Sequence, residues 1–292
     1  MIQFLQQIVN SLSLGSVYVL VALGYTMVYG IIHLINFAHG DIYMVGAYLG
    51  YLCIVRFHMG FVPALLCTMV GTMVLGVIIE RVAYKPLRNA SRIAALITAI
   101  AVSILLEYVV MYFMGPDIKT YSAVLPSTIY HIGDVVVTFQ QILIFLISIA
   151  LMICLNLFVT RTKTGCAMRA VSADADAARL MGIDVDRTIS ITFALGSALA
   201  GAAGIMVGIY YNTINPLMGS TPGMKAFIAA VFGGVGSIPG AMIGGFVIAF
   251  IETMVGGYIS SLLKDAVVYA LLIVILIFKP SGLLGVNRRE KV

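Results

Sequence analysis

Charged residues are scarce in this sequence. Only 10% of its 292 residues are charged and 61% are hydrophobic, whereas a soluble domain carries roughly 25% charged and about 45–50% apolar residues. Because so few charges could not solvate a globular surface, the composition excludes a soluble domain and predicts a polytopic membrane protein. The net charge of +5 does not indicate nucleic-acid binding, since the basic residues stand in loops between apolar runs, where membrane topology explains them.

Several features with a defined chemistry are also missing. The first 30 residues contain no Lys or Arg, although a secretory signal peptide begins with a basic segment, so we expect a retained first helix. No G-x-x-x-x-G-K-[ST] loop is present, and the chain therefore cannot cradle ATP phosphates by that means. The cysteines form no CxxC pair and are expected to be small buried hydrophobes: Cys53, Cys67, Cys154 and Cys166.

The apolar residues are gathered into runs that suit membrane-spanning helices, which need about 20 residues each. The segment 224–234 is too short to cross, because its 11 residues reach roughly 16 Å as a helix. Strand-period alternation is absent from the runs, which argues against a membrane barrel. We therefore predict an all-α domain over 1–292 with a re-entrant half-helix and about eight spans, at 8–32, 40–55, 61–80, 93–114, 141–160, 188–211, 240–258 and 260–278.

Basic residues mark the cytoplasmic ends of membrane helices, and here they form three clusters. These contain Arg81, Lys85, Arg88 and Arg92; Arg161, Lys163, Arg169, Arg179 and Arg187; and Lys279, Arg288, Arg289 and Lys291. We expect residues 85–92, 161–187 and 286–292 in the cytoplasm and residues 117–135 in the periplasm. The N-terminus then lies outside and the C-terminus inside, if 224–234 and 240–258 form a hairpin.

A short charged helix is predicted at 172–182, within the cytoplasmic part of this scheme. Ser172 is a candidate N-cap, and Gly182 can adopt the left-handed conformation that ends many helices. Its apolar face would consist of Ala173, Ala177, Leu180 and Met181. Because so short a helix is not stable by itself, it must pack on a surface, and composition leaves open whether that surface is lipid, its own bundle or a partner.

Four motifs, in this order along the chain, resemble one family. They are "INFAHGDIYMVGAYLG" (35–50), "AVSADADAARLMGIDVDR" (170–187), "AAVFGGVGSIPGAMIGG" (229–245) and "KPSGLLG" (279–285). The chain is similar to the permease subunits of bacterial ABC importers for branched-chain amino acids and ribose-like sugars, and to the shorter of the two amino-acid permease types. The second motif resembles the coupling helix of that family at Ala177, Ala178, Arg179, Leu180 and Gly182.

The resemblance implies a type II ABC importer-like permease in the bacterial inner membrane that is not itself an enzyme. Its implied partners are a second homologous permease in a heterodimer, two ABC ATPases that use ATP and Mg, and a periplasmic amino-acid-binding protein. The chain itself would hold no cofactor or metal. The implied substrates are Leu, Ile and Val; urea or short-chain amides, or a stand-alone secondary transporter, are the alternatives.

Polar and glycine-rich stretches inside the apolar runs are candidates for the substrate pathway. Asn36, His39 and Gly40 could face a solute if Gly40 breaks the helix, or Asn36 and His39 could cap a turn at the cytoplasmic surface. Glu107 and Glu252 are single carboxylates within spans.

Glycines are the second group of pathway candidates. Gly233, Gly234 and Gly236, with Gly240, could form a break of the kind found in transporters or only permit close packing. The four-residue spacing of Gly196, Ala200, Gly204 and Gly208 favours helix packing.

Overall fold

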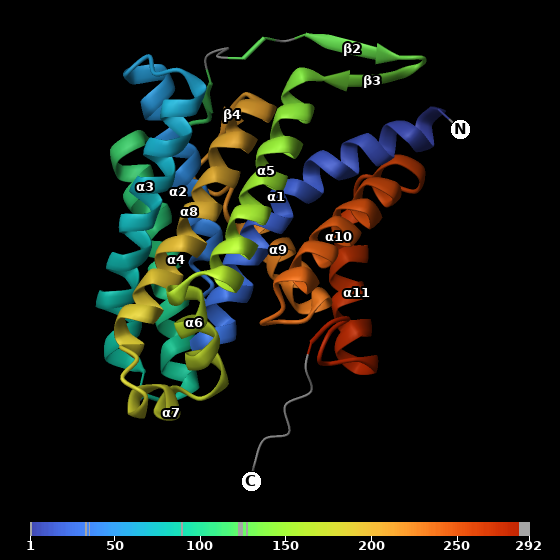
Figure 1. The fold of residues 1–292 in the computed structure, drawn as a ribbon. Coiled ribbons are helices and arrows are strands. Elements are labelled where there is room, and N and C mark those ends of the chain that lie inside the picture. Colours follow the sequence, from blue (N-terminus) through green and yellow to red (C-terminus); the bar gives the residue numbers. More distant parts are fainter. Residues whose placement is uncertain are drawn as a thin grey trace.

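The computed structural model describes residues 2–32, 34, 36–88, 90–121, 125–126 and 128–285. Helices dominate this part of the chain (Figure 1). The α-helices are α1 (Ile2–Ile32), α2 (His39–Tyr51), α3 (Phe61–Ile79), α4 (Arg92–Met114), α5 (Phe139–Arg161), α6 (Lys163–Ala173), α7 (Ala175–Leu180), α8 (Val185–Tyr211), α9 (Ser220–Gly233), α10 (Ile238–Tyr258) and α11 (Lys264–Phe278).

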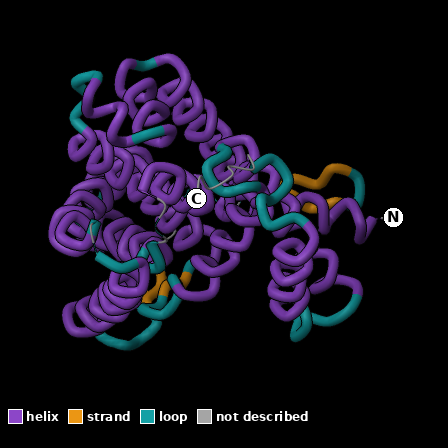
Figure 2. The backbone as a smooth tube through the Cα atoms, turned by 90° about the horizontal axis from the view of Figure 1, so that it is seen from below, coloured by secondary structure: helices purple, strands orange, loops and turns teal. Residues whose placement is uncertain are grey.

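Two small antiparallel sheets join the loops at one end of the bundle. One pairs β1 (Lys119–Thr120) with β4 (Thr213–Ile214), and the other is a hairpin of β2 (Ile129–Ile132) and β3 (Val135–Thr138). Viewed from below, the rest of the tube is mostly helix, with loops between the helices (Figure 2). The hairpin was not predicted, although its two-residue turn contains Gly133 with a φ of 63°, a signal typical of such turns.

The predicted all-α membrane architecture is confirmed in the described residues. Six helical segments are long and apolar enough to cross a membrane: Ile2–Ile32, Phe61–Leu87, Ile93–Met114, Phe139–Arg161, Val185–Tyr211 and Ile238–Tyr258. The helices α2 and α11 fill the remaining two predicted spans but are shorter. The predicted half-helix is α9, which begins at Ser220 and has 14 residues, so that it is about 21 Å long.

Two helices form the centre of the bundle. Most residues of α1 and α8 are buried, and α8 packs against α1, α2 and α3. By contrast, α4 and α5 expose large apolar side chains such as Ile97, Tyr112 and Leu146. In a membrane protein this outer surface faces lipid. Three cysteines, Cys67, Cys154 and Cys166, are also exposed, so the expectation of buried cysteines holds only for Cys53.

Small residues let these central helices approach closely, as their spacing predicted. A Cβ atom on Gly204 would lie 2.1 Å from the carbonyl oxygen of Tyr43 in α2, and one on Gly196 would lie 3.2 Å from the Cα of Gly24 in α1. No side chain larger than hydrogen fits at the first position without moving α2. Backbone contact of this kind is how helices associate in lipid, where the hydrophobic effect does not drive helix pairing.

The two ends of the bundle are distinct. At the hairpin end, the side chain of Gln6 near the start of α1 forms two 2.9 Å hydrogen bonds with the backbone of Val136 in β3. At the opposite end, which we call the α7 end, Arg88 pairs with Asp186 at the start of α8. The first two basic clusters therefore share one end, as the topology scheme requires, while residues 286–292 lie outside the described part of the chain.

This arrangement predicts which loops a membrane-impermeant maleimide reaches. In a variant without native cysteines, Asp134→Cys in the hairpin turn should be labelled in intact cells. Asp176→Cys on α7 should be labelled only after permeabilisation. Both side chains are exposed, so accessibility to the reagent depends on the membrane alone. Labelling of Asp176→Cys in intact cells would contradict the predicted orientation.

Candidate functional site

The helix α7 projects from the end of the bundle between α6 and α8 (Figure 1). It begins at Asp174, whose carboxylate accepts hydrogen bonds from the backbone N–H groups of Asp176 (2.9 Å) and Ala177 (3.0 Å). It ends at Gly182, which has a φ of 81°. There the N–H of Gly182 donates to the carbonyl of Arg179. The N–H of the next residue makes the second of the two hydrogen bonds that define a Schellman motif.

The prediction that Ser172 is the N-cap of this helix is wrong. Ser172 lies within α6, and its hydroxyl donates to the backbone oxygen of Gly30 in α1. The extended backbone of Asp174, with a φ of −159°, separates α6 from α7, and its carboxylate can accept both free N–H groups. The helix therefore covers Ala175–Leu180 instead of the predicted 172–182.

The predicted apolar face of α7 points away from the bundle. Leu180 is 90% exposed and Met181 is 82% exposed, and Ala177 is exposed beside them. Only Ala178 is buried, at 4% exposure, against the rest of the chain. The charged Arg179 bonds to Asp176 one turn earlier, at 3.2 Å. Two large apolar side chains of this segment are thus exposed, while the opposite side of α7 packs on the rest of the chain.

A cluster of ion pairs ties the neighbourhood of α7 to α3. Arg88 contacts both Glu80, which is fully buried, and Asp186 in the first turn of α8. Lys85 adds a second contact to Asp186, at 2.9 Å. The hydroxyl of Ser190 donates to the other oxygen of Glu80, at 2.7 Å. Sequence reasoning assigned these basic residues to topology only and missed the buried acid that they surround.

The polar residues of "NFAHGD" are buried instead of lying at a surface turn. Asn36 is 2% exposed and accepts a 2.9 Å hydrogen bond from the hydroxyl of Tyr84. His39 is 1% exposed, and its ring lies edge-on to Tyr25 of α1 with 4.8 Å between centroids. The N-cap of α2 is Ala38, which makes no side-chain cap. The capping alternative for Asn36 and His39 is therefore wrong.

The helix break at Gly40, which was the condition for free backbone groups facing a solute, does not occur, since α2 continues from His39 to Tyr51. Gly40 instead provides the close contact between α2 and α9. A Cβ atom at Gly40 would lie 2.5 Å from the carbonyl oxygen of Gly219 and 3.0 Å from the Cα of Gly223. The glycine is needed here for its size and not for an unusual backbone conformation.

The glycine-rich stretch after α9 does turn the chain sharply. Gly234 and Gly236 have φ values of 109° and 89°, which side chains rarely permit. Gly233 and Gly240 face each other across this turn, and a Cβ atom on Gly233 would lie 1.9 Å from the carbonyl oxygen of Gly240. Both interpretations of the stretch therefore apply: two glycines make the turn between α9 and α10, and two allow the helices to touch.

A group of charges, buried at Lys225 and Glu252 and partly exposed at Asp265, joins α9 to α10 and α11. The ammonium of Lys225 in α9 lies 2.6 Å from a carboxylate oxygen of Glu252 in α10 and 2.6 Å from one of Asp265 in α11. The other oxygen of Glu252 accepts a 2.8 Å hydrogen bond from the hydroxyl of Tyr18. We call these four residues the Lys225 cluster. Sequence reasoning treated Glu252 as single, because its partners are far away along the chain.

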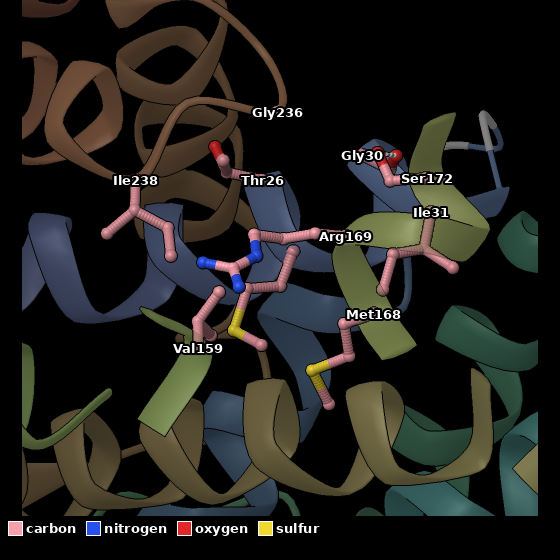
Figure 3. A pocket seen from close by; sticks show the side chains of 10 residues that line it. Thr26, Gly30, Ile31, Val159, Met168, Arg169, Ser172, Gly236 and Ile238 are labelled. Carbon is pink, nitrogen blue, oxygen red and sulfur yellow. Dashed lines mark hydrogen bonds between the residues drawn. The ribbon is translucent and has the colours of Figure 1, made fainter. Parts of the chain in front are cut away.

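Cavities lie beyond both ends of α9. One, of about 450 Å³, includes the Lys225 cluster side chains Lys225, Glu252 and Tyr18, and is bounded by the hairpin-end halves of α1, α8, α10 and α11. The other, of about 230 Å³, lies between α1, α5, α6 and the turn at Gly236. Figure 3 shows the guanidinium of Arg169 pointing into this second cavity, near Ile238 and Val159.

These features define a class of protein. A helical membrane bundle with a broken helix between two cavities, buried charges within its helices and an exposed apolar helix at one end has the parts of a transport subunit that works with a partner. Among the described residues no group of three or more His, Cys, Asp or Glu side chains could hold a metal ion.

Comparison with known sequences identifies the family. Residues 7–276 match the family described as the permease component of the branched-chain amino acid transport system. The high-affinity branched-chain amino acid transport permease BraD of Pseudomonas aeruginosa is 42% identical over 99% of this chain and 98% of its own length. LivH of Escherichia coli shows the same identity and coverage. A probable LivH of Methanocaldococcus jannaschii is 32% identical over 93% of this chain. The chain therefore belongs to this permease family.

The Arg88 cluster predicts a large difference between two neighbouring substitutions. Arg88→Met leaves the buried carboxylate of Glu80 without its cation, which should cost about 3–5 kcal/mol of stability. Lys85→Met removes a half-exposed partner of Asp186 and should cost about 0–1 kcal/mol. Thermal unfolding of the purified protein in detergent measures both. Equal losses for the two variants would contradict a structural role for the buried pair.

Proposed function

We propose that this chain is the membrane-spanning permease subunit of an ATP-driven importer for the branched-chain amino acids Leu, Ile and Val. Family membership supports the transport system, and the exposed apolar face of α7 is the observation that carries the subunit role. Because the chain has no nucleotide-binding loop, the energy of ATP would reach it from another protein in this proposal, and the exposed face of α7 would contact that protein.

In this proposal α7 is the coupling helix and docks in a groove of an ABC ATPase. Removing the Leu180 and Met181 side chains from water would contribute about 1.5–3 kcal/mol each, which compensates for their exposure in the free subunit. Ala177 is a small exposed residue one turn before them, so the helix backbone can approach the partner there. Ala178, Arg179 and Gly182 hold the shape of the helix and its ending.

The proposed complex contains this chain and a second homologous permease as a heterodimer, two ATPases that bind ATP and Mg, and a periplasmic amino-acid-binding protein. The chain would lie in the bacterial inner membrane. Its N-terminus would be periplasmic and its C-terminus cytoplasmic, because the α7 end carries the basic clusters and the hairpin end carries few basic residues. The binding protein would then meet the hairpin end.

The proposed mechanism is alternating access. The ATPases can shift the bundle only if they bind one of its states better than the other. A displacement of α7 acts directly on the start of α8, and through Arg88 and Glu80 on the end of α3. The helix α8 packs on α1 and α2, which carry the central polar residues. The substrate pathway in this proposal passes Asn36, His39, Gly40, Glu252 and the turn formed by Gly233, Gly234 and Gly236.

Ala177→Glu tests the coupling role. The change places a bulky charge on the docking face, so we expect loss of ATPase subunits on co-purification and loss of ATP-driven transport in liposomes. Arg179→Ala should have a smaller effect, since exposed ion pairs contribute about 0–1 kcal/mol. Ala90→Glu is the matched control, because Ala90 is exposed in the loop between α3 and α4. Full ATPase binding and full transport by Ala177→Glu would rule out α7 as the coupling element.

His39→Ala tests the proposed pathway. The ring of His39 fills a space against Gly24 and Tyr25, and its Nε2 atom has no hydrogen-bond partner among the described residues. We expect lower leucine uptake with unchanged ATPase co-purification. His58→Ala, at an exposed site in the loop before α3, is the control. Unchanged uptake by His39→Ala would assign the residue to packing alone.

A further inference from the structure

The cavity at the hairpin end of α9 contains both signs of charge in a buried setting. Lys225 and Glu252 are only 4% and 5% exposed at their side chains. A buried ion pair gains little stability over well-packed apolar side chains of the same volume, because both ions lose their hydration. Buried charged side chains within the helices of a membrane protein mark substrate and ion pathways. The pair therefore needs an explanation beyond stability.

The charges of the Lys225 cluster and the neighbouring Lys264 are balanced. Lys225 contacts two carboxylates, Glu252 and Asp265, and Lys264 lies 3.8 Å from the same oxygen of Glu252. Two cations thus face two anions. Tyr18 holds the second oxygen of Glu252, so the oxygen that contacts Lys225 has a fixed direction. A single added charge would upset this balance, whereas a molecule that carries one charge of each sign would not.

We propose that the Lys225–Glu252 pair is the recognition site for the zwitterionic backbone of the transported amino acid; this rests on the proposed function of the chain. The substrate carboxylate accepts hydrogen bonds from the ammonium of Lys225, and the substrate ammonium donates to Glu252. The two charged groups of the substrate are attached to one carbon atom and therefore lie close together. Lys225 and Glu252 are also close, at 2.6 Å, and the substrate would separate them. Every buried charge keeps a partner when the substrate enters and when it leaves.

One part of the cavity wall suits a small apolar side chain. Leu14 and Val17 of α1, Val207 of α8 and Pro222 of α9 line its wall. The volume of about 450 Å³ lies in the range of roughly 300–1,000 Å³ that small-molecule sites occupy. The site selects α-amino acids against uncharged solutes such as urea and amides, which cannot replace the contact between Lys225 and Glu252. It also selects against molecules that carry only one of the two charges, since these would upset the balance of two cations and two anions.

The first experiment separates recognition from structural pairing. Lys225→Met, Glu252→Gln and the double variant are made in the complete complex with the second permease, the ATPases and the binding protein, with Lys119→Met in the hairpin-end loop as control. We expect each single variant and the double variant to lose leucine uptake by roughly 100-fold. The double variant should co-purify with its partners like the wild type, because the two charges that lose a contact in it, Asp265 and Lys264, are 42% and 41% exposed at their side chains. Recovery of uptake in the double variant, or its failure to assemble, would overturn the proposal.

The second experiment measures binding without ATP. Thermal unfolding of the purified complex, free of the binding protein, is followed with L-leucine, with the anion 4-methylpentanoate and with the cation isopentylammonium. We expect leucine alone to raise the Tm of the wild type, and no shift in Lys225→Met or the double variant. Absence of a leucine shift, or an equal shift with either analogue, would overturn the recognition site. A rise in Tm with leucine but no ATP-driven uptake would support the recognition site and refute the proposed function instead.

Discussion

The architecture depends on the close approach of helix backbones at glycine. In lipid there is no hydrophobic gain in bringing two apolar helices together, so contacts between backbones and small residues must hold the bundle. Gly46 of α2 meets Gly201 of α8, where an added Cβ atom would lie 2.5 Å from the opposite Cα. Gly40 meets Gly223 of α9 in the same way. These contacts hold α2 against α8 and α9, beside the central helices α1 and α8.

Close packing at the centre determines where polar groups can lie. The helices α1, α2 and α9 are surrounded by protein, so they can carry His39, Asp41 and Lys225 at less than 4% exposure, which a lipid-facing helix could not do. Each of these groups faces another helix instead of lipid: Asp41 accepts from Ser103 of α4, and Lys225 reaches α10 and α11. The buried charges therefore depend on the glycine contacts, because the close packing of the helices keeps these charges away from lipid.

Sequence reasoning was most successful where a property is local. Apolar length gave the spans, and the spacing of Gly196 and Gly204 gave a packing face, because each depends on a few consecutive turns. It failed where the partner is distant: Ser172 was assigned a cap although its hydroxyl bonds to Gly30, and the capping interpretation of Asn36 could not anticipate Tyr84. The Lys225 cluster was missed for the same reason, since Lys225 stands alone in an apolar segment.

The short helix α9 connects these observations to transport. It is too short to cross a bilayer, its first turns carry Lys225, and the turn after it lies beside the second cavity. A helix with one end in each of two cavities can close one while the other is open, provided that its neighbours have two arrangements of similar energy. The N–H of Leu284 donates to the carbonyl of Gly233, which ties the end of α9 to the segment after α11. The Lys225 cluster joins α9 to α1, α10 and α11, and in the proposed function the transported solute would pass beside it.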